Sequence, residues 1–205
     1  MKIVALGDSL TVGETEFEFS NSDESVSYPK YLETITKQHL SALQSNLEVN
    51  VLNRGISGDL TSGMLERFVN DVVDEKADYV IILGGTNDIG YGLDLATIAH
   101  NLTIMYDTAR NNRIVAVACS VPSILGLDEL IQPRLQLNSM IRTEAEKRRI
   151  AFVDFFTATA DPRTNRLSKD YSTDGLHLNS KGYRQMGQYI FDNWLRPLLS
   201  NCGRS

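Results

Sequence analysis

Short apolar runs alternate along the chain with longer segments in which apolar residues recur every three or four positions. The short runs occupy residues 2–6, 48–52, 79–83, 114–119 and 150–154. Four of them are apolar almost throughout, as in strands that are covered on both faces. The run at 48–52 is more polar and fits an edge position. The sequence therefore predicts five β-strands, with the second at an edge of the sheet.

The longer segments have the apolar spacing of amphipathic helices. They cover residues 29–43, 60–75, 93–111, 129–149 and 180–198. Pro29 suits the first turn of its helix, and Pro133 is placed to bend its helix or to delay its start. Parallel strands need crossover connections of this kind. The alternation of strand and helix thus predicts an α/β fold in which helices wrap a parallel sheet.

The length and composition fit one globular domain. The chain has 205 residues, of which 42% are hydrophobic and 22% are charged, and it shows no repeat or linker. We expect a single domain over residues 1–199 and a disordered tail at 200–205. Cys119 lies in an apolar run and is expected to be a small buried side chain, and the Trp194 face is expected to belong to the core.

The charge and hydrophobicity exclude several classes of partner. A formal net charge of −6 argues against binding to nucleic acid, and the chain offers no basic stripe for an anionic membrane surface. No stretch approaches the ~18 apolar residues that a membrane-spanning helix needs. The first apolar run is too short for a signal peptide. We therefore expect a cytoplasmic protein; the sequence does not indicate its oligomeric state.

Three motifs with candidate chemistry each follow a predicted strand. Ser9 follows the first strand in a Gly-Asp-Ser-Leu sequence, Gly58 follows the second, and Asn87 follows the third in a Gly-Gly-Thr-Asn-Asp sequence. The carboxyl ends of the strands form the ligand-binding edge of an open α/β sheet. We therefore expect these three residues to lie close together.

A candidate base for Ser9 stands near the other end of the chain. A serine hydroxyl is a poor nucleophile unless a neighbouring group takes its proton. His39 and His100 fall inside predicted helices without an acidic partner, whereas His177 follows Asp174 by three residues. Asp174 can accept the ring N–H and fix the tautomer. Each motif alone is common in ordinary loops, but together they predict a Ser-His-Asp triad.

Three hydrogen-bond donors are available for a negative charge that develops on the substrate. They are the backbone N–H of Ser9, the backbone N–H of Gly58 and the side-chain amide of Asn87. In acyl transfer, such donors stabilise the tetrahedral oxyanion, and the loss of one costs about 2.7–4 kcal/mol. These residues therefore form the predicted oxyanion hole.

At this point the motifs carry a family resemblance. Gly7-Asp8-Ser9-Leu10-Thr11, Gly58, Asn87 and His177 match the four blocks of the SGNH hydrolases, the GDSL esterase/lipase family, in the same order. The resemblance implies a three-layer flavodoxin-like sandwich with sheet order 2-1-3-4-5. It also implies that Ser9, Asp174 and His177 are catalytic and that Ser9, Gly58 and Asn87 bind the oxyanion. Leu178 stands where many relatives have Pro, which leaves the assignment intact.

Two other functions fit parts of the pattern. Asp8, Asp59, Asp88 and Asp154 also fall at strand ends, and clustered carboxylates can bind Mg²⁺ for phosphoryl chemistry. Three of them adjoin candidate site residues, so we expect them to brace the loops by accepting backbone N–H bonds. A non-catalytic binding module on the same fold is the second alternative. The complete set of triad residues favours an enzyme.

The sequence thus predicts a hydrolase that cleaves small-molecule carboxylic esters through an acyl-enzyme, without a cofactor or metal. Short acyl esters, aryl esters and lysophospholipids are the expected substrates, and a carbohydrate O-acetylesterase is the alternative. Phe17 and Phe19 follow Ser9 in a long loop, and Ile124 and Leu125 follow the fourth strand. These four side chains are candidates for an apolar substrate wall.

Overall fold

The computed structural model describes residues 1–13 and 26–202 of the chain. Within them, the strands form one five-stranded, all-parallel sheet in the order β2-β1-β3-β4-β5. The strands are β1 (Lys2–Gly7), β2 (Asn50–Gly55), β3 (Tyr79–Leu83), β4 (Val115–Cys119) and β5 (Ala151–Val153). The predicted fold class, the strand order and the edge position of β2 are confirmed.

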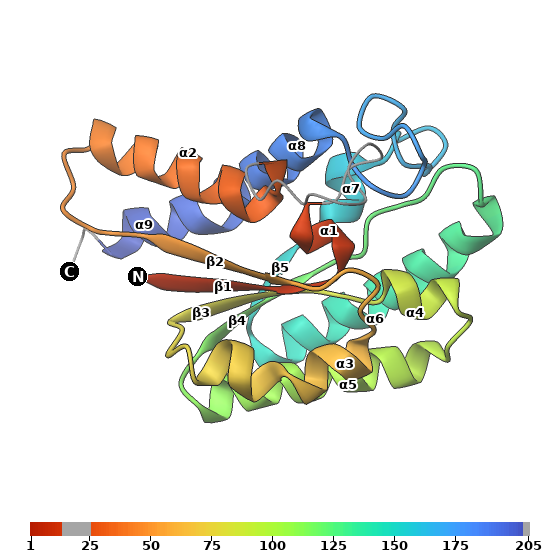
Figure 1. Ribbon diagram of the computed structural model, residues 1–205, viewed down its shortest axis with the longest axis horizontal. Helices are drawn as coiled ribbons and strands as arrows, with labels where there is room; N and C mark the ends of the chain where they lie inside the picture. The colour runs from red at the N-terminus through yellow and green to blue at the C-terminus, as the bar shows by residue number, and fades with distance from the viewer. Residues whose placement is uncertain (14–25, 203–205) are drawn as a thin grey trace.

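Helices cover both faces of the sheet (Figure 1). One layer holds α1 (Ser9–Val12), α2 (Tyr28–Ala42), α7 (Phe155–Thr159), α8 (Ser180–Ile190), the π-helical segment η4 (Phe191–Leu195) and α9 (Arg196–Cys202). The other holds α3 (Thr61–Glu66), the π-helical segment η2 (Val69–Val73), α4 (Thr86–Gly90), α5 (Leu95–Asn111), the 3₁₀ turn η3 (Asp128–Leu130) and α6 (Ile131–Arg148). The arrangement is a three-layer sandwich.

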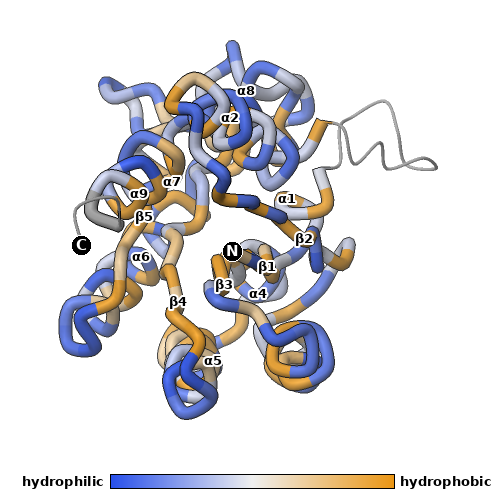
Figure 2. The backbone as a smooth tube through the Cα atoms, turned by 90° about the vertical axis from the view of Figure 1, so that its left-hand side faces the viewer, coloured by the Kyte–Doolittle hydropathy of each residue, from blue (hydrophilic) through white to orange (hydrophobic). Residues whose placement is uncertain are grey.

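The core lies on both sides of the sheet because successive strand residues point to opposite faces. In β1, for example, Ile3 and Ala5 pack toward the α2 and α8 layer, whereas Val4 and Leu6 pack toward the α3 and α5 layer. All four side chains are fully buried. Figure 2 shows hydrophobic positions concentrated on the strands and on the sheet-facing sides of the helices. Two buried faces explain the nearly continuous apolar runs in the sequence.

Two single-residue expectations are confirmed. Cys119 is 1% exposed and packs in the core. Trp194 is also buried, and its ring meets that of Tyr79 edge-on at a centroid distance of 5.6 Å. Both residues therefore belong to the core on the side of the sheet that α2 and α8 cover.

Several element boundaries differ from the predicted ones. β2 begins and ends later than predicted, because Asn53 and Arg54 pair with β1 despite their polarity. The single helix predicted over 60–75 is α3 followed by η2. Pro133 lies in the first turn of α6, after a 3₁₀ turn, in agreement with the predicted delay in the helix start.

The C-terminal boundary needs correction. The predicted tail begins at residue 200, but α9 continues through Cys202. The Ser200 hydroxyl donates to the Arg196 carbonyl at 2.9 Å inside this helix, so the helix includes the first residues of the predicted tail. Elsewhere in the described ranges, no helix is both long enough and apolar enough to cross a membrane.

Candidate active site

Ser9 lies just beyond the carboxyl end of β1, at the first position of α1. Asp8 caps this helix, because its Oδ1 accepts the Leu10 N–H at 3.0 Å. Gly13 ends the helix one turn later. Ser9 is 5% exposed, and its N–H is among the first amides of the helix, which have no acceptor within it. The tight strand-to-helix turn thus holds the hydroxyl at the strand end.

The His177 ring lies against this hydroxyl. Its Nε2 is 3.1 Å from Ser9 Oγ, and its Nδ1 is 2.8 Å from Asp174 Oδ2. The two halves of the predicted triad, 168 residues apart in the chain, are therefore in hydrogen-bond contact. The geometry matches a nucleophile, a base and a carboxylate that orients the base.

A compact turn fixes Asp174 and His177 relative to each other. Asp174 Oδ1 accepts the backbone N–H groups of Leu176 and His177, each at 2.8 Å. Partial burial raises the pKa of Asp174, but these bonds and the His177 ring outweigh that effect and hold the pKa below its ordinary value. The carboxylate therefore stays charged beside the imidazole.

Ser172 and Gly175 complete this turn. The buried Ser172 hydroxyl donates to the His177 carbonyl at 2.6 Å and accepts the Gly175 N–H at 2.9 Å. Gly175 has φ +87°, and a Cβ there would stand 2.3 Å from the Leu125 carbonyl oxygen, so only glycine fits. The sequence alone did not indicate a role for Ser172. Its position two residues before an Asp-Gly pair is the signal that points to a turn.

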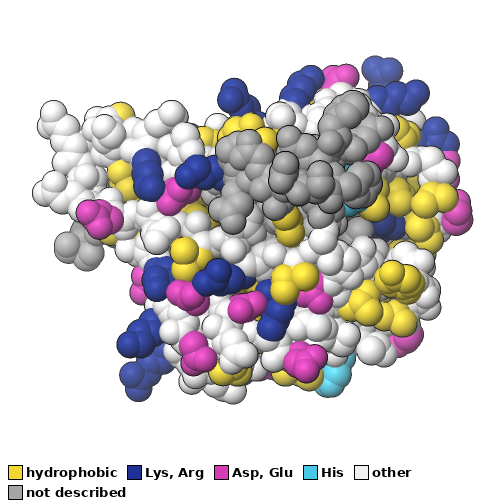
Figure 3. Space-filling view, in the orientation of Figure 1, with side chains coloured by type: hydrophobic (Ala, Val, Ile, Leu, Met, Phe, Trp, Pro, Cys, Tyr) yellow, Lys and Arg dark blue, Asp and Glu magenta, His cyan; other side chains and the backbone are white. Residues whose placement is uncertain are grey.

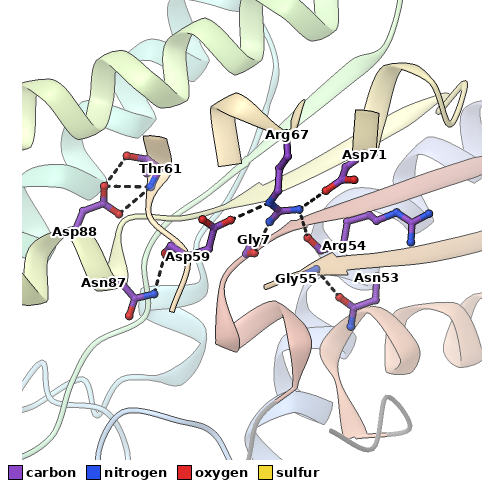
Figure 4. Close-up of polar contacts among 10 residues, drawn as sticks. All are labelled: Gly7, Asn53, Arg54, Gly55, Asp59, Thr61, Arg67, Asp71, Asn87 and Asp88. Atoms are coloured by element: carbon purple, nitrogen blue, oxygen red, sulfur yellow. Dashed lines mark hydrogen bonds and ion pairs between the residues drawn. The ribbon is translucent and has the colours of Figure 1, made fainter. Parts of the chain in front are cut away.

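The three predicted oxyanion donors follow strand ends that are aligned in the sheet. Gly7 pairs with Gly55 on one side and with Leu83 on the other. Gly58 has φ +73°, and no described atom lies within 4 Å of the position of a Cβ. Asn87 lies in α4, where its Nδ2 donates one hydrogen bond to the Asp59 carbonyl at 2.9 Å (Figure 4). An amide NH₂ has a second proton to donate.

Arg67 joins the strand ends beneath these donors (Figure 4). Its guanidinium donates to the Gly7 carbonyl at 3.0 Å and to the Arg54 carbonyl at 2.8 Å. It also contacts Asp59 Oδ2 at 2.9 Å and Asp71 Oδ2 at 2.5 Å. The side chain is 14% exposed. One arginine thus ties the ends of β1 and β2 to the loop that carries Gly58, a role that its helical position in the sequence did not indicate.

Asp88 braces the segment that carries Asn87. Its buried carboxylate accepts the Thr61 N–H at 3.1 Å and the Thr61 hydroxyl at 2.6 Å (Figure 4). Thr61 Oγ1 also accepts a hydrogen bond from Asn101 at 3.1 Å. The start of α3 is thereby linked to α4 and α5, which fixes Asn87 relative to the Gly58 loop.

The aspartates at the strand ends have protein partners that explain their positions. Asp8 and Asp88 accept backbone N–H bonds, as predicted, whereas Asp59 binds the Arg67 side chain. Asp154 accepts the Thr157 N–H at 3.1 Å and caps α7. Across residues 1–13 and 26–202, no group of three or more His, Cys, Asp or Glu side chains is placed to hold a metal ion.

Asp8 carries the strongest electrostatic perturbation close to Ser9. Its side chain is fully buried, and Oδ2 has no hydrogen-bond partner among the described residues. Burial raises the pKa of Asp8 to about 7, and the charges of Asp88 and Asp59 add to the rise. The Leu10 N–H and His177 oppose it. The cap of α1 is therefore a carboxyl group with a pKa of about 7.

Arg134 is a second buried charge, on α6, that the sequence analysis missed. It is 1% exposed; Nη1 donates to the Leu130 carbonyl at 3.1 Å, and Nε has no partner in the described part of the chain. Burial lowers the pKa of Arg134 to about 10, and the Asp8 charge partly offsets this. Asn138 lies one turn further along the same face of α6. Its side chain accepts the Val121 N–H and donates to the Val121 carbonyl, just after β4. Arg134 therefore lies on the face of α6 that packs near the strand ends.

The predicted substrate wall is only partly described. Phe17 and Phe19 lie outside the described residues. Ile124 is 4% exposed and packs with Ile131 and Phe156, so its side chain holds the loop on the core. Leu125 is partly buried, and its N–H donates to the Gly175 carbonyl at 2.9 Å. This loop therefore supports the Asp174 turn, and substrate contact by these residues stays a prediction.

Fold and sequence together define the class of protein. The family model for the GDSL-like lipase/acylhydrolase family matches residues 5–185. This match spans Ser9, Gly58, Asn87 and His177, and the sheet order is the one expected for the family. The chain belongs to the GDSL-like lipase/acylhydrolase family, a family of hydrolases.

Individual relatives support the same assignment. An acetylxylan esterase from Geobacillus stearothermophilus is 32% identical over 97 residues, which cover 46% of this chain and 42% of that protein. The uncharacterized lipoprotein YqeF from Bacillus subtilis (strain 168) is 33% identical over 86 residues, or 42% of this chain and 31% of that protein. The matched parts thus span well under half of each relative.

A solved structure matches over nearly the whole length. A putative lipolytic protein of the G-D-S-L family from Desulfitobacterium hafniense DCB-2 has a TM-score of 0.75 at 25% identity. The match covers 92% of this chain and 97% of that one. The three-layer architecture is therefore shared with a protein described as belonging to the G-D-S-L family.

Proposed function

We propose that this protein hydrolyses carboxylic esters of small molecules through a covalent acyl-enzyme on Ser9. His177 Nε2 accepts the hydroxyl proton as Ser9 Oγ attacks the ester carbonyl. The same histidine then gives this proton to the leaving alcohol. A water molecule activated by His177 releases the acid and restores Ser9. None of these steps requires a cofactor.

Asp174 and the three donors complete the mechanism. The Asp174 carboxylate accepts the Nδ1 proton, holds the ring in the productive tautomer and stabilises the imidazolium that forms during attack. The Ser9 N–H, the Gly58 N–H and the second Asn87 N–H stabilise the tetrahedral oxyanion. Arg67 and Asp88 keep the donor loops in register, so the donors need little reorganisation when charge develops.

The observation that carries the proposal is the 3.1 Å contact between His177 Nε2 and Ser9 Oγ, with Asp174 2.8 Å behind the ring. Ser9→Ala and His177→Ala should each lower kcat for p-nitrophenyl acetate by about 10⁴-fold or more. Circular dichroism and the melting temperature should show that both variants remain folded. Wild-type-like turnover in either folded variant would refute the mechanism.

The sequence alone favours short acyl esters as substrates and makes carbohydrate acetates the second candidate. The likeness to an acetylxylan esterase supports the second candidate. Rates across p-nitrophenyl esters from acetate to dodecanoate, measured beside an acetylated sugar, separate the two. A clear preference for the sugar would replace the first choice with the second. The cytoplasmic location stays a prediction from the sequence.

A further inference from the structure

An exposed aromatic residue lies one helical turn after Asn87. Tyr91 follows the last residue of α4 and is 76% exposed. Its hydroxyl has no hydrogen-bond partner among the described residues. Such a side chain adds nothing to the core, and tyrosine is enriched at contact sites because it presents an apolar ring and a polar hydroxyl.

The helix places Tyr91 on the same side as Asn87. The Tyr91 N–H donates to the Asn87 carbonyl at 2.9 Å, so the two residues are one helical turn apart. Side chains four positions apart lie on one face of a helix, about 5.4 Å from each other along the axis. The Asn87 amide binds the Asp59 carbonyl in the loop after β2, which sets the direction of this face. Tyr91 therefore lies one step outward from the predicted oxyanion hole.

The neighbours of Tyr91 leave its ring uncovered. It is flanked by Gly90 and Gly92, which have no side chains to cover the ring, and no described atom from elsewhere in the fold lies within 4 Å of the Cβ position of either glycine. Leu93 and Ile56, the latter in the loop that leads to Gly58, are also exposed, at 41% and 48%. Figure 3 shows hydrophobic side chains gathered over the region of α4 on this face. The result is an open, flat aromatic surface with an apolar surround.

We propose that Tyr91 is a specificity-determining residue that stacks against a sugar ring in the alcohol part of the ester. This inference rests on the proposed function, because the acyl carbonyl must sit between Ser9 and Asn87. The rise of one helical turn between Asn87 and Tyr91, about 5.4 Å, is similar to the distance from an acetyl carbonyl to the ring of the sugar that carries it. The C–H face of the sugar would cover the aromatic face, and the unpaired Tyr91 hydroxyl can bond to sugar hydroxyls. An open platform of this kind suits a rigid ring better than a flexible acyl chain.

Two acetate esters test the assignment. Xylose tetraacetate presents a sugar ring, whereas ethyl acetate presents none, and acid release in a pH-stat follows both. The measured quantity is the ratio of kcat/KM for the sugar acetate to that for ethyl acetate. Tyr91→Ala and Tyr91→Leu should each lower this ratio by about fivefold to tenfold, and Tyr91→Trp should retain it. Leu43→Ala removes another exposed side chain, at the end of α2 before the amino end of β2 and so at the opposite end of the strands from the candidate site, and should leave the ratio unchanged.

Each alternative outcome overturns the inference. A ratio that is unchanged in Tyr91→Ala rules out stacking, and so does a wild-type protein that cleaves ethyl acetate but not the sugar ester. If Tyr91→Ala instead lowers kcat/KM for vinyl laurate relative to kcat/KM for vinyl acetate, the residue contacts an acyl chain, and the inference is wrong. Failure of the proposed function is a separate result, because no ester would then be cleaved or Ser9→Ala would remain active.

Discussion

The buried carboxyl group of Asp8 makes the stability of this protein depend on pH in a defined direction. Its pKa is raised to about 7 in the folded chain, from an ordinary value of 3.8. A carboxyl whose folded pKa lies above its unfolded pKa takes up a proton on folding. Its contribution to stability is therefore complete at acidic pH and is lost as the pH rises through about 7. Asp8→Asn keeps an oxygen for the Leu10 N–H but removes the titration.

The size of the effect follows from the two pKa values. Between about pH 5 and pH 6 the folded carboxyl holds nearly one proton more than the unfolded one, so this pH unit lowers the free energy of unfolding by ~1.4 kcal/mol; the slope is about half as steep at pH 7 and nearly zero by pH 8. From pH 5 to pH 8, Asp8 alone should lower the stability of the wild-type protein by about 2.5 kcal/mol. Asp8→Asn should lack this component and should be the more stable protein at pH 8.

Urea unfolding at pH 5, 6, 7 and 8, followed by circular dichroism, measures the effect in both proteins. Asp94→Asn is the matched control, since Asp94 caps α5 through the Thr97 N–H at 3.0 Å but is exposed to solvent. It should follow the wild-type pH profile. If the free energy of unfolding changes with pH in the same way in wild type and Asp8→Asn, burial does not raise the pKa of Asp8, and the predicted pH dependence is wrong.

Three further changes test the supports of the site. Asn87→Ala removes one oxyanion donor and should lower kcat on p-nitrophenyl acetate by about 10²–10³-fold; a loss below about threefold would exclude this role. Lysine cannot reproduce the planar guanidinium that binds two carbonyls and two carboxylates. Arg67→Lys should therefore lower the free energy of unfolding by about 2–3 kcal/mol in urea, and an unchanged midpoint would contradict the bracing role of Arg67. Arg134→Met should lower the free energy of unfolding by about 1 kcal/mol more at pH 8, where Asp8 is charged, than at pH 5. An equal loss at the two pH values would show that Arg134 and Asp8 are not coupled.

The sheet was predictable because its signal is local and repeated. Strands buried on both faces must be apolar nearly throughout, and β1, β3 and β4 follow that rule closely. β2 was the weakest prediction, since Asn53 and Arg54 extend it through pairing with β1 and side-chain bonds rather than through apolar content. The short helices α1, α4 and α7 have too few residues for an apolar repeat. The cap side chains of Asp8 and Asp154 are their clearest local signals.

The site was predictable where its residues have a distinctive chemistry and follow strand ends. Ser9 and Asn87 meet both conditions, whereas His177 was indicated by Asp174 three residues before it. The supporting residues do not meet these conditions, because Arg67 and Ser172 act through contacts with carbonyls that are distant in sequence or made only in a folded turn. Arg134 carries no motif at all. Its importance arises from burial, which depends on how α6 packs and which its own sequence surroundings do not reveal.

Covalent labelling shows directly whether His177 activates Ser9 as a nucleophile. Intact-protein mass spectrometry after treatment with a fluorophosphonate, followed by peptide mapping, identifies the labelled residue. We expect one adduct, located on Ser9, that is absent from Ser9→Ala and forms at least about 10³-fold more slowly in His177→Ala. An adduct on another residue would show that Ser9 is not the nucleophile. Equal labelling rates in wild type and His177→Ala would show that His177 does not activate it.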